Sequence, residues 1–447
     1  MCEARLGTVG GEWILSALQR GPEPRWVAQL RRRSLDLFGK LAWPDSGEEN
    51  WRFTDYRRLL PPQLLDRKTP GGATRNEIAR IDFDLRALVP DAVAVWGGTE
   101  VHVRADGLLL REIHAALSDD SPDLRRLLVG MAEHARDRFD ALSFATFGSG
   151  VTLDVAPGTE LAAPVGIQLA PAGGARGWDS SLSVIRLGPE TRGAIVLHFA
   201  PGQPQGDSWG MDRIHIEVGE NSRWDFLFIQ GLGADQNRLQ RIRMRISEGA
   251  EVRVNRVDWG GATVKAEMSF SLQDSGSRLL VRGVYAAEGS QHLELDTLQD
   301  HLGPLNASDL LVKGVVAGSS TAVHRGHIWI HPEAGGSSAY QANRNLILSR
   351  GAHVHAIPML DIQASDVRCS HASATGPVDR DQIFYIRSRG VSLREALRLI
   401  VAGFLSGNLA GAKPERLVRV VEESLAAKLD HLLPAEDEVL GETSISD

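Results

Sequence analysis

Cysteine is scarce in this chain. The 447-residue sequence contains only Cys2 and Cys369, and it has no C-x-x-C motif. Two thiols are too few for a disulfide framework, and a conventional Cys-ligated iron–sulfur cluster needs about four thiolates. We therefore expect that one copy of the chain cannot hold such a cluster alone, and that a thiol-based metal role requires a second subunit.

Long apolar runs and a strong charge of one sign are also missing. No uninterrupted apolar run is long enough to span a bilayer, and residues 1–5 lack the basic-then-apolar layout of a signal peptide. Charged residues make up 24% of the chain and the formal net charge is −8. This balance gives no electrostatic reason to bind nucleic acid or anionic lipid. We expect a cytoplasmic protein with neither a membrane nor a nucleic acid partner.

Signatures of single-chain catalysis are absent too. The sequence contains no G-x-S-x-G, no P-loop, no H-E-x-x-H and no G-x-G-x-x-G that opens a helix. Asp and Glu are dispersed along the predicted strands, although alternate strand positions can align on one face without a motif. We expect that the protein is not an enzyme by itself. The alternative, a polysaccharide-active β-helix enzyme, needs Asp and Glu clustered with Arg or Lys on one face and is usually secreted.

Short strands and turns dominate from residue 145 to residue 388. Glycine is abundant, with 46 residues, and four segments share one form, a Gly beside small or polar residues followed by a strand: V-G-E-N-S-R-W-D-F, S-E-G-A-E-V-R-V-N, Q-D-S-G-S-R-L-L-V and S-R-G-A-H-V-H-A-I. The first three recur about 26–30 residues apart, and the fourth lies about three such periods further on. A repeat of this length is typical of one solenoid coil. The pattern favours a mainly β solenoid over a sandwich or barrel, for which about 250 residues are long.

Helical patterns flank this core. In the N-terminal region, residues 1–144, we expect helices over residues 24–44 and 123–143, the second with Asp120 or Ser121 as N-cap. The C-terminal region, residues 389–447, predicts helices over 392–405 and 414–433, and Ser392 with Glu395 forms a capping box. An acidic tail from Glu436 onward is expected to be disordered. Two short amphipathic helices cannot make their own core, so they must pack on the solenoid end or on a partner.

Histidine is concentrated in one segment. Six of the fourteen histidines lie between residues 324 and 371, namely His324, His327, His331, His353, His355 and His371. Alternate residues of a strand face the same side, which predicts that His353 shares a face with His355, and His327 with His331. Imidazole is a ligand that suits iron. Surface or hydrogen-bonded histidines explain the same pattern, so the spacing alone leaves both interpretations open.

The C-S-H segment differs because it combines a thiol with an imidazole. On a strand, Cys369 and His371 project from the same face, close enough to share one metal or sulfur species. A buried cysteine is also usually a small apolar filler. Cys369 and His371 are therefore the candidate metal site, and simple packing is the structural alternative.

Longer motifs resemble the SufB/SufD family of iron–sulfur cluster assembly proteins. Residues 324–404 contain H-P followed by A-Y-Q-x-N-R-N-L-x-L-S, then P-x-L-x-I-x-A-x-D-V-x-C-S-H, then F-Y-x-R-S-R-G. Upstream, E-N-W-R-F-T-D at residues 49–55 resembles the family's N-terminal E-x-W-R-Y-T signature. The C-S-H form and the N-R-N-L segment look like SufD. SufB-like chains have H-E-A-T at the histidine and a cysteine near N-R-N-L-I-L, where this chain has no thiol.

The resemblance implies a fold and an assembly. It implies a right-handed parallel β-helix flanked by helical N- and C-terminal parts, which pairs with a SufB-like subunit through the β-helix. A homodimer is the implied assembly in the absence of SufB. It also implies docking of a SufC-like ABC ATPase on the C-terminal helices, about residues 391–433, whose apolar stripe contains Leu393, Leu397, Ile400 and Phe404.

The resemblance also assigns a role to the C-S-H segment. It implies that His371, with Cys369, faces the SufB interface and helps a SufB cysteine to hold a nascent Fe–S cluster. The family complex is associated with reduced flavin, but no residue in this sequence points to a flavin site. We expect no cofactor to be bound tightly by the chain alone.

The sequence departs from the family directly after the histidine. The family commonly has C-S-H-G-A-T, whereas Ala372, Ser373 and Ala374 follow His371 here. Replacing the glycine changes how closely a partner backbone can approach. A structural adaptor without metal chemistry, in which the His and Cys segment is merely surface, is the remaining alternative.

Overall fold

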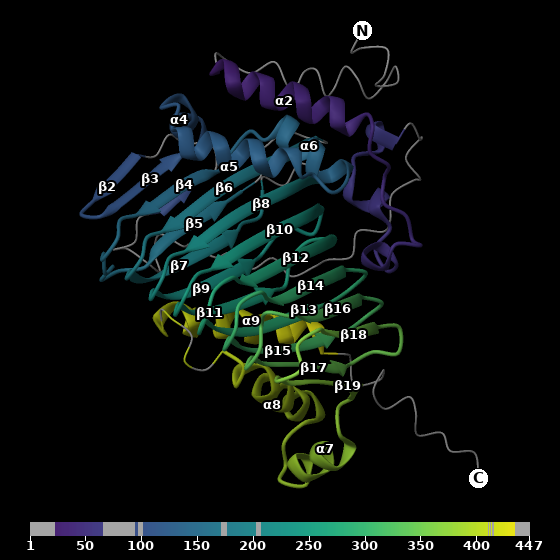
Figure 1. The fold of residues 1–447 in the computed structure, drawn as a ribbon. Coiled ribbons are helices and arrows are strands. Elements are labelled where there is room, and N and C mark those ends of the chain that lie inside the picture. Colours follow the sequence, from purple (N-terminus) through teal and green to yellow (C-terminus); the bar gives the residue numbers. More distant parts are fainter. Residues whose placement is uncertain are drawn as a thin grey trace.

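The computed structural model describes residues 23–65, 94–96, 102–170, 177–202, 207–409, 411, 413 and 415–433. A long parallel β-solenoid makes up most of this part of the chain, with helices before and after it (Figure 1). The N-terminal residues 1–5, with Cys2, and the acidic tail from Glu436 lie outside the described residues. None of the helices in the described ranges is long and apolar enough to cross a membrane.

Two sheets form the walls of the solenoid. Sheet A contains nine strands in the order β1-β5-β7-β9-β11-β13-β15-β17-β19, and sheet B contains ten in the order β18-β16-β14-β12-β10-β8-β6-β4-β3-β2. From β4 onward, consecutive strands alternate between the sheets, so each coil contributes one strand to each wall. Apart from the antiparallel pairs β2–β3 and β3–β4, the described ladders are parallel. The mainly β solenoid predicted from the repeats is confirmed, and the sandwich or barrel is wrong.

The strands of both sheets have these bounds. They are β1 Ala94–Trp96, β2 His102–Ala105, β3 Leu108–Glu112, β4 Val151–Val155, β5 Val165–Leu169, β6 Trp178–Leu187, β7 Arg192–Phe199, β8 Ser208–Val218, β9 Arg223–Gln230, β10 Gln236–Ile246, β11 Glu251–Asp258, β12 Thr263–Leu272, β13 Arg278–Ala287, β14 His292–His301, β15 Ala307–Val316, β16 Thr321–Ile330, β17 Ser338–Ile347, β18 His353–Ile362 and β19 Arg368–Pro377.

Alternate side chains of each strand point into the solenoid and form its core. In β12 the inward set is Val264, Ala266, Met268, Phe270 and Leu272, all buried. Similar inward sets from both sheets make one continuous apolar cluster along the first coils. Full burial of a large apolar side chain stabilises the fold by about 1.5–3 kcal/mol. The alternation of inward and outward side chains along these strands therefore supplies the apolar contacts that hold the two sheets together.

The repeated turns align as predicted, with one exception. Arg223, Glu251 and Arg278 begin β9, β11 and β13 and are direct neighbours in sheet A. The turns before them contain residues with positive φ, such as Gly249 at 62° and Gly276 at 74°. The fourth segment does not belong to this row, because His353 begins β18 in sheet B. The same turn chemistry therefore serves two different corners of the solenoid.

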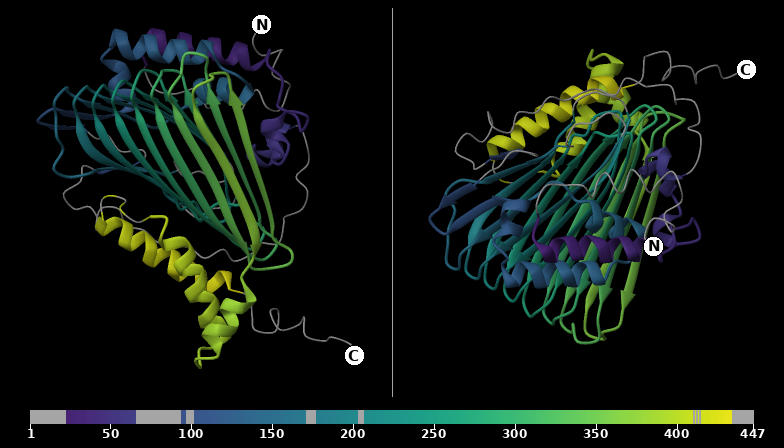
Figure 2. Two further views of the ribbon diagram at one scale, coloured as in Figure 1. Left: turned by 60° about the horizontal axis from the view of Figure 1, so that its bottom comes forward. Right: turned by 90° about the horizontal axis from the view of Figure 1, so that it is seen from above.

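Helices of the N-terminal region cover the outer face of sheet B (Figure 2). They are α2 Arg25–Phe38, α4 Ile113–Ser118, α5 Pro122–Glu133 and α6 Arg138–Thr146, with the short 3-10 turns η2 Glu49–Trp51, η3 Tyr56–Leu59 and η4 Pro62–Leu65. The first predicted helix is confirmed, although it ends at Phe38. The single helix predicted over residues 123–143 is wrong. Asp137 explains the break, because its side chain accepts the Asp140 N–H and caps a new helix.

The C-terminal region contains the helices α7 Arg380–Arg387, α8 Leu393–Ser406 and α9 Glu415–Leu432. Of these, α8 and α9 lie against the outer face of sheet A. The predicted cap of α8 is confirmed, since the Ser392 hydroxyl accepts the Glu395 N–H at 3.2 Å. Apolar residues of α8 and α9 share a cluster with the outer face of sheet A. These two helices therefore pack on a wall of the solenoid, and not on its end as predicted. The unpredicted α7 has no buried residue and projects from the body (Figure 1).

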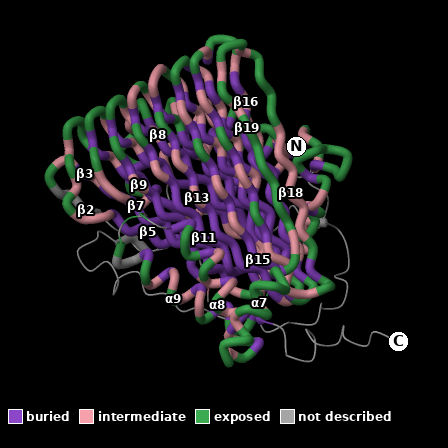
Figure 3. Tube along the Cα trace, turned by 90° about the horizontal axis from the view of Figure 1, so that it is seen from below, coloured by how far each residue is buried: buried purple, intermediate pink, exposed green. Residues whose placement is uncertain are grey.

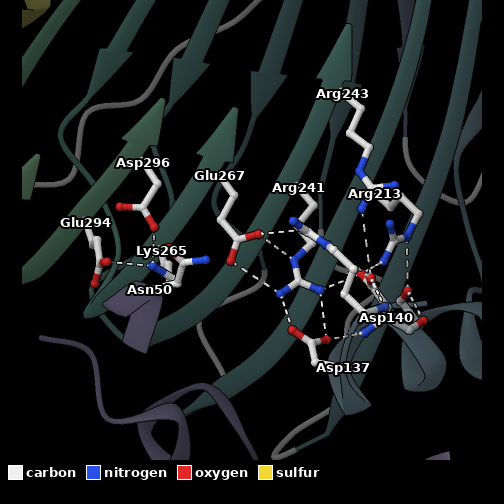
Figure 4. Close-up of polar contacts among 12 residues, drawn as sticks. Asn50, Asp137, Asp140, Arg213, Arg241, Arg243, Lys265, Glu267, Glu294 and Asp296 are labelled. Atoms are coloured by element: carbon white, nitrogen blue, oxygen red, sulfur yellow. Dashed lines mark hydrogen bonds and ion pairs between the residues drawn. The ribbon is translucent and has the colours of Figure 1, made fainter. Parts of the chain in front are cut away.

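Buried ion pairs join α6 to sheet B (Figure 4). Asp140, which is 1% exposed, contacts the guanidinium groups of Arg213 and Arg241. Arg241 also lies 2.5 Å from Asp137 Oδ2 and 2.8 Å from Glu267 Oε2. Burial alone would raise the pKa of Asp140, but Arg213 and Arg241 hold it well below its usual range. These charges pair across the junction between the helices and the solenoid.

Candidate functional site

The last coil of the solenoid is open. Strand β18 pairs with β16, and β19 pairs with β17, and no described strand pairs with the other edge of either. Every residue of these two strands is exposed or half-buried (Figure 3). Tyr340, Leu360 and Ile362 are exposed apolar groups at this end, between 38% and 44% accessible. Free strand edges with exposed apolar groups are competent to pair with another chain.

Cys369 and His371 lie on β19 in register with the buried Ala339 and Gln341 of β17, so both are on the inward-facing side, as their spacing predicts. Cys369 packs against a small cluster that includes Ile328 and Ala339. Further along the same face, four residues beyond His371, Thr375 meets Asn345, with Asn345 Nδ2 3.0 Å from Thr375 Oγ1. Cys369 is half-buried and His371 is exposed. Burial raises the pKa of the Cys369 thiol, so a metal ion that binds its sulfur would have to displace the thiol proton.

The interior near this end becomes polar. Gln341, Asn343 and Asn345 of β17 are buried, with between 3% and 4% of each residue exposed. Asn345 accepts a hydrogen bond from the buried Tyr285 hydroxyl and donates to Asn343. Burial raises the pKa of the Tyr285 phenol, which therefore stays a neutral donor. The apolar core of the first coils thus gives way to a hydrogen-bonded layer beside Cys369 and His371.

The other histidines do not gather around this pair. His324 points inward and is 3% exposed, and burial lowers its pKa to about 4. His327 and His331 lie on the opposite, outer side of β16, where their rings stack on Trp329. His331 Nε2 is 2.9 Å from Asp300 Oδ1. The predicted sharing of a face by His327 and His331 is therefore seen, but on the side away from His371.

His353 and His355 occupy the outer face of β18. Their register with Thr321 and Val323 puts them on the outer side, and the His355 ring lies 4.5 Å from that of Phe53. Among the described residues, no group of three or more His, Cys, Asp or Glu side chains is arranged to hold a metal ion. The six histidines are thus divided between the interior and the outer face of sheet B and the exposed edge at β19.

The E-N-W-R-F-T-D segment packs on charged residues of sheet B. Thr54 Oγ1 is 2.7 Å from His292 Nε2, and Asn50 Oδ1 accepts from Arg325 Nη1 at 2.8 Å. Beneath them, Lys265 Nζ lies 2.6 Å from Glu294 Oε1 (Figure 4). The segment therefore covers a buried charge cluster on β12, β14 and β16. Sequence reasoning missed this cluster because its members are far apart in the chain.

The apolar stripe of α8 mostly faces its own chain. Leu393 and Leu397 are 5% and 4% exposed, and Ile400 and Phe404 are half-buried against the same cluster. These four residues were expected to meet a partner, but the stripe is filled by α9 and the solenoid wall. The apolar side chains that stay exposed in this region are Phe384, Tyr385 and Leu399, at 74%, 59% and 52%. They form the available surface of α7 and α8.

The fold and this site define a parallel β-solenoid protein whose last, open coil presents a thiol and an imidazole at a sheet edge. The SufBD core domain of SUF-system FeS cluster assembly matches residues 174–404. The chain belongs to the SufB/SufD family of iron–sulfur cluster assembly proteins, which confirms the resemblance drawn from its motifs. This membership gives no support to the polysaccharide-active alternative.

Several curated relatives are similar over most of the chain. An iron–sulfur cluster assembly SufBD family protein of Mycobacterium leprae is 28% identical over 400 residues, which covers 87% of this chain and 90% of the relative. A SufBD family protein of Mycobacterium bovis is 31% identical over 306 residues, 66% of this chain and 74% of the relative. Similarity to the iron–sulfur cluster assembly protein SufD of Escherichia coli is partial, with 29% identity over 175 residues, 39% and 40% of the two chains.

Proposed function

We propose that this chain is the SufD-type subunit of a SufBCD-type complex, and that it acts as a scaffold and not as a free-standing enzyme. The observation that carries the proposal is the position of Cys369 and His371 on one face of the exposed edge strand β19. Partial similarity to SufD of E. coli supports the same branch of the family. The complex would work in the cytoplasm.

The chemistry proposed for this edge is shared ligation of a nascent Fe–S cluster, which is the cargo of the complex. His371 offers a neutral imidazole, and Cys369 offers a thiolate once its proton is lost. Two groups are too few to complete the coordination of a cluster. A SufB-like partner that pairs with the open coil would bring its own cysteine to the same place. Ala372 points to the other side of β19 from His371, so its methyl group stands beside the donors and not between them.

The proposed partners use two different surfaces. The free edges of β18 and β19 would pair with the SufB-like subunit, or with a second copy of this chain when SufB is absent. The exposed side chains Phe384, Tyr385 and Leu399 would dock the SufC-like ATPase. Aromatic residues that stand free on a projecting helix are typical anchors of a protein interface.

Replacing His371 by alanine tests the cluster site. In the purified complex, anaerobic iron and sulfide titration should give a cluster yield lower by about tenfold or more, because the variant removes one of the ligands of the cluster. His134→Ala is the matched control, since His134 is an exposed histidine at the end of α5 and lies on neither edge strand. An unchanged cluster yield for His371→Ala would refute the site. It would leave the structural adaptor as the better description.

Replacing Phe384 by aspartate tests the ATPase surface. A charge at an aromatic anchor should weaken association by about 2 kcal/mol or more, roughly 30-fold. The measurement is co-purification and the dissociation constant for the SufC-like subunit. Leu305→Asp is the matched control, because Leu305 is 64% exposed at a solenoid turn. Equal effects of the two variants would move the docking surface elsewhere.

A further inference from the structure

Two polar rows face each other across the last two strands of sheet A. Gln341, Asn343 and Asn345 on β17 are in register with His371, Ser373 and Thr375 on β19. One rung of this ladder is closed, because Asn345 Nδ2 donates to Thr375 Oγ1 at 3.0 Å. Adjacent strands lie about 4.8 Å apart. Side chains paired in this register can therefore bond directly, and Gln341 occupies the rung of His371.

The amide of Gln341 is held at one end only. Its Nε2 lies 3.0 Å from the Gly326 carbonyl oxygen and 3.5 Å from that of Met359. Two carbonyl acceptors identify this end of the amide as the nitrogen. The residue is 4% exposed, yet Oε1 accepts no hydrogen bond from any described residue. A buried acceptor without a donor costs about 1–3 kcal/mol of folding free energy. Gln341 Oε1 therefore lowers stability in the isolated chain and is available to accept a hydrogen bond.

Gly326 of β16, in the facing sheet B, leaves space for this oxygen. A Cβ atom added at Gly326 would lie 2.3 Å from Gln341 Oε1, closer than any real Cβ contact allows. The absence of a side chain at this position is thus what permits the observed place of the amide. An alanine at residue 326 would displace the Oε1 end of the amide without removing the amide itself.

We propose that Gln341 is a positioning residue for His371. Its free Oε1 accepts a hydrogen bond from one ring N–H of His371, which leaves the lone pair of the other ring nitrogen directed to iron. A histidine that binds metal ordinarily donates its second N–H to an oxygen that fixes its tautomer and orientation. This inference rests on the proposed function of His371 as a ligand, and it adds the group that prepares the ring.

The test begins with the full chain, free of metal and partner. Ring nitrogens of ¹⁵N-histidine-labelled protein are observed by NMR in alkaline buffer, and the His371 signals are assigned with His371→Gln. We expect one dominant His371 tautomer in the original chain and a mixture of both in Gln341→Met, which keeps the length but loses the oxygen. Asn343→Leu removes a buried amide from the neighbouring rung and should leave the His371 signals unchanged. Identical His371 signals in the original chain and Gln341→Met would overturn the proposal.

Two more variants keep the test decisive if Gln341→Met does not fold. Gln341→Glu retains an acceptor oxygen and should retain the single tautomer, whereas Gly326→Ala should give the mixture. In the assembled complex, Gln341→Met should weaken iron binding about tenfold or more. If His371→Ala loses the cluster but Gln341→Met and Gly326→Ala change neither tautomer nor binding, the positioning role fails alone. If the tautomer responds while His371→Ala keeps the cluster, the proposed function fails and the hydrogen bond stands.

Discussion

Replacing Asp140 by alanine should lower the free energy of unfolding by about 3–5 kcal/mol, the cost of removing one partner from a buried ion pair. Asp140 Oδ1 contacts both Arg213 and Arg241, whose side chains are 3% and 2% exposed. Without the carboxylate, the Ser143 hydroxyl, 3.2 Å from Arg213 Nε, is the remaining side-chain hydrogen-bond partner of Arg213 in the described part of the chain. Two guanidinium groups would then face each other with one negative partner fewer, and water has little access to either.

Urea unfolding of the single chain, followed by tryptophan fluorescence, measures this loss. Asp123→Ala is the matched control, because Asp123 belongs to an ion pair with Arg126 whose side chains are 75% and 81% exposed. Exposed pairs contribute about 0–1 kcal/mol. A similar small effect for both variants would contradict the view that this network fastens the N-terminal helices to the solenoid.

The solenoid itself was predictable because its cause is local and repeated. One turn followed by one strand recurs in each coil, as at Glu248–Ala250 and Asp274–Gly276. Recognising the pattern in one coil therefore predicts it in the next. The break at Asp137 was missed for a different reason. A continuous apolar spacing over residues 123–143 hides a cap that only the packing of α6 on sheet B reveals.

The candidate site was predictable only within one strand. Alternation put Cys369 and His371 on one face, and β19 has them there. Gln341 lies 30 residues earlier, and nothing in the spacing says that β17 pairs with β19 in this register. The alternating Q-x-N-x-N and H-x-S-x-T patterns were the available signal. The apolar stripe of α8 shows a different limit. The sequence of an amphipathic helix does not tell whether its apolar face packs on its own chain or on a partner.

Acidification should destabilise the chain well above the range in which carboxylates titrate. Burial lowers the pKa of His198, His301 and His324 to about 4, against about 6.5 in the unfolded chain. Below about pH 6.5 the unfolded state binds protons that the native state refuses, so stability falls as the pH falls. Between about pH 7.5 and 5 each histidine should cost about 2 kcal/mol.

One buried carboxyl acts in the opposite direction. Burial raises the pKa of Asp296 to about 7, with Lys265 opposing and Glu294 adding to the rise. The native state therefore takes up a proton there as the pH falls through 7, and the gain of about 2 kcal/mol offsets roughly one histidine. The pKa values of Glu267 and Glu294 are lowered to about 2, so the stability that these two carboxylates contribute to the fold is lost only below about pH 4.5. The net loss above pH 5 should thus be about 3–4 kcal/mol.

Urea midpoints measured across this range separate the two contributions. His324→Gln removes one imidazole and should reduce the loss between about pH 7.5 and 5 by about 2 kcal/mol, whatever its effect at neutral pH. His134→Gln replaces an exposed ring and is the matched control for the loss of an imidazole. Asp296→Asn removes the opposing group and should steepen the loss by a similar amount. A stability that is flat from neutral pH down to pH 5 in all four proteins would mean that the buried rings are hydrated and protonate in place, so that the polar interior near β19 is open to water.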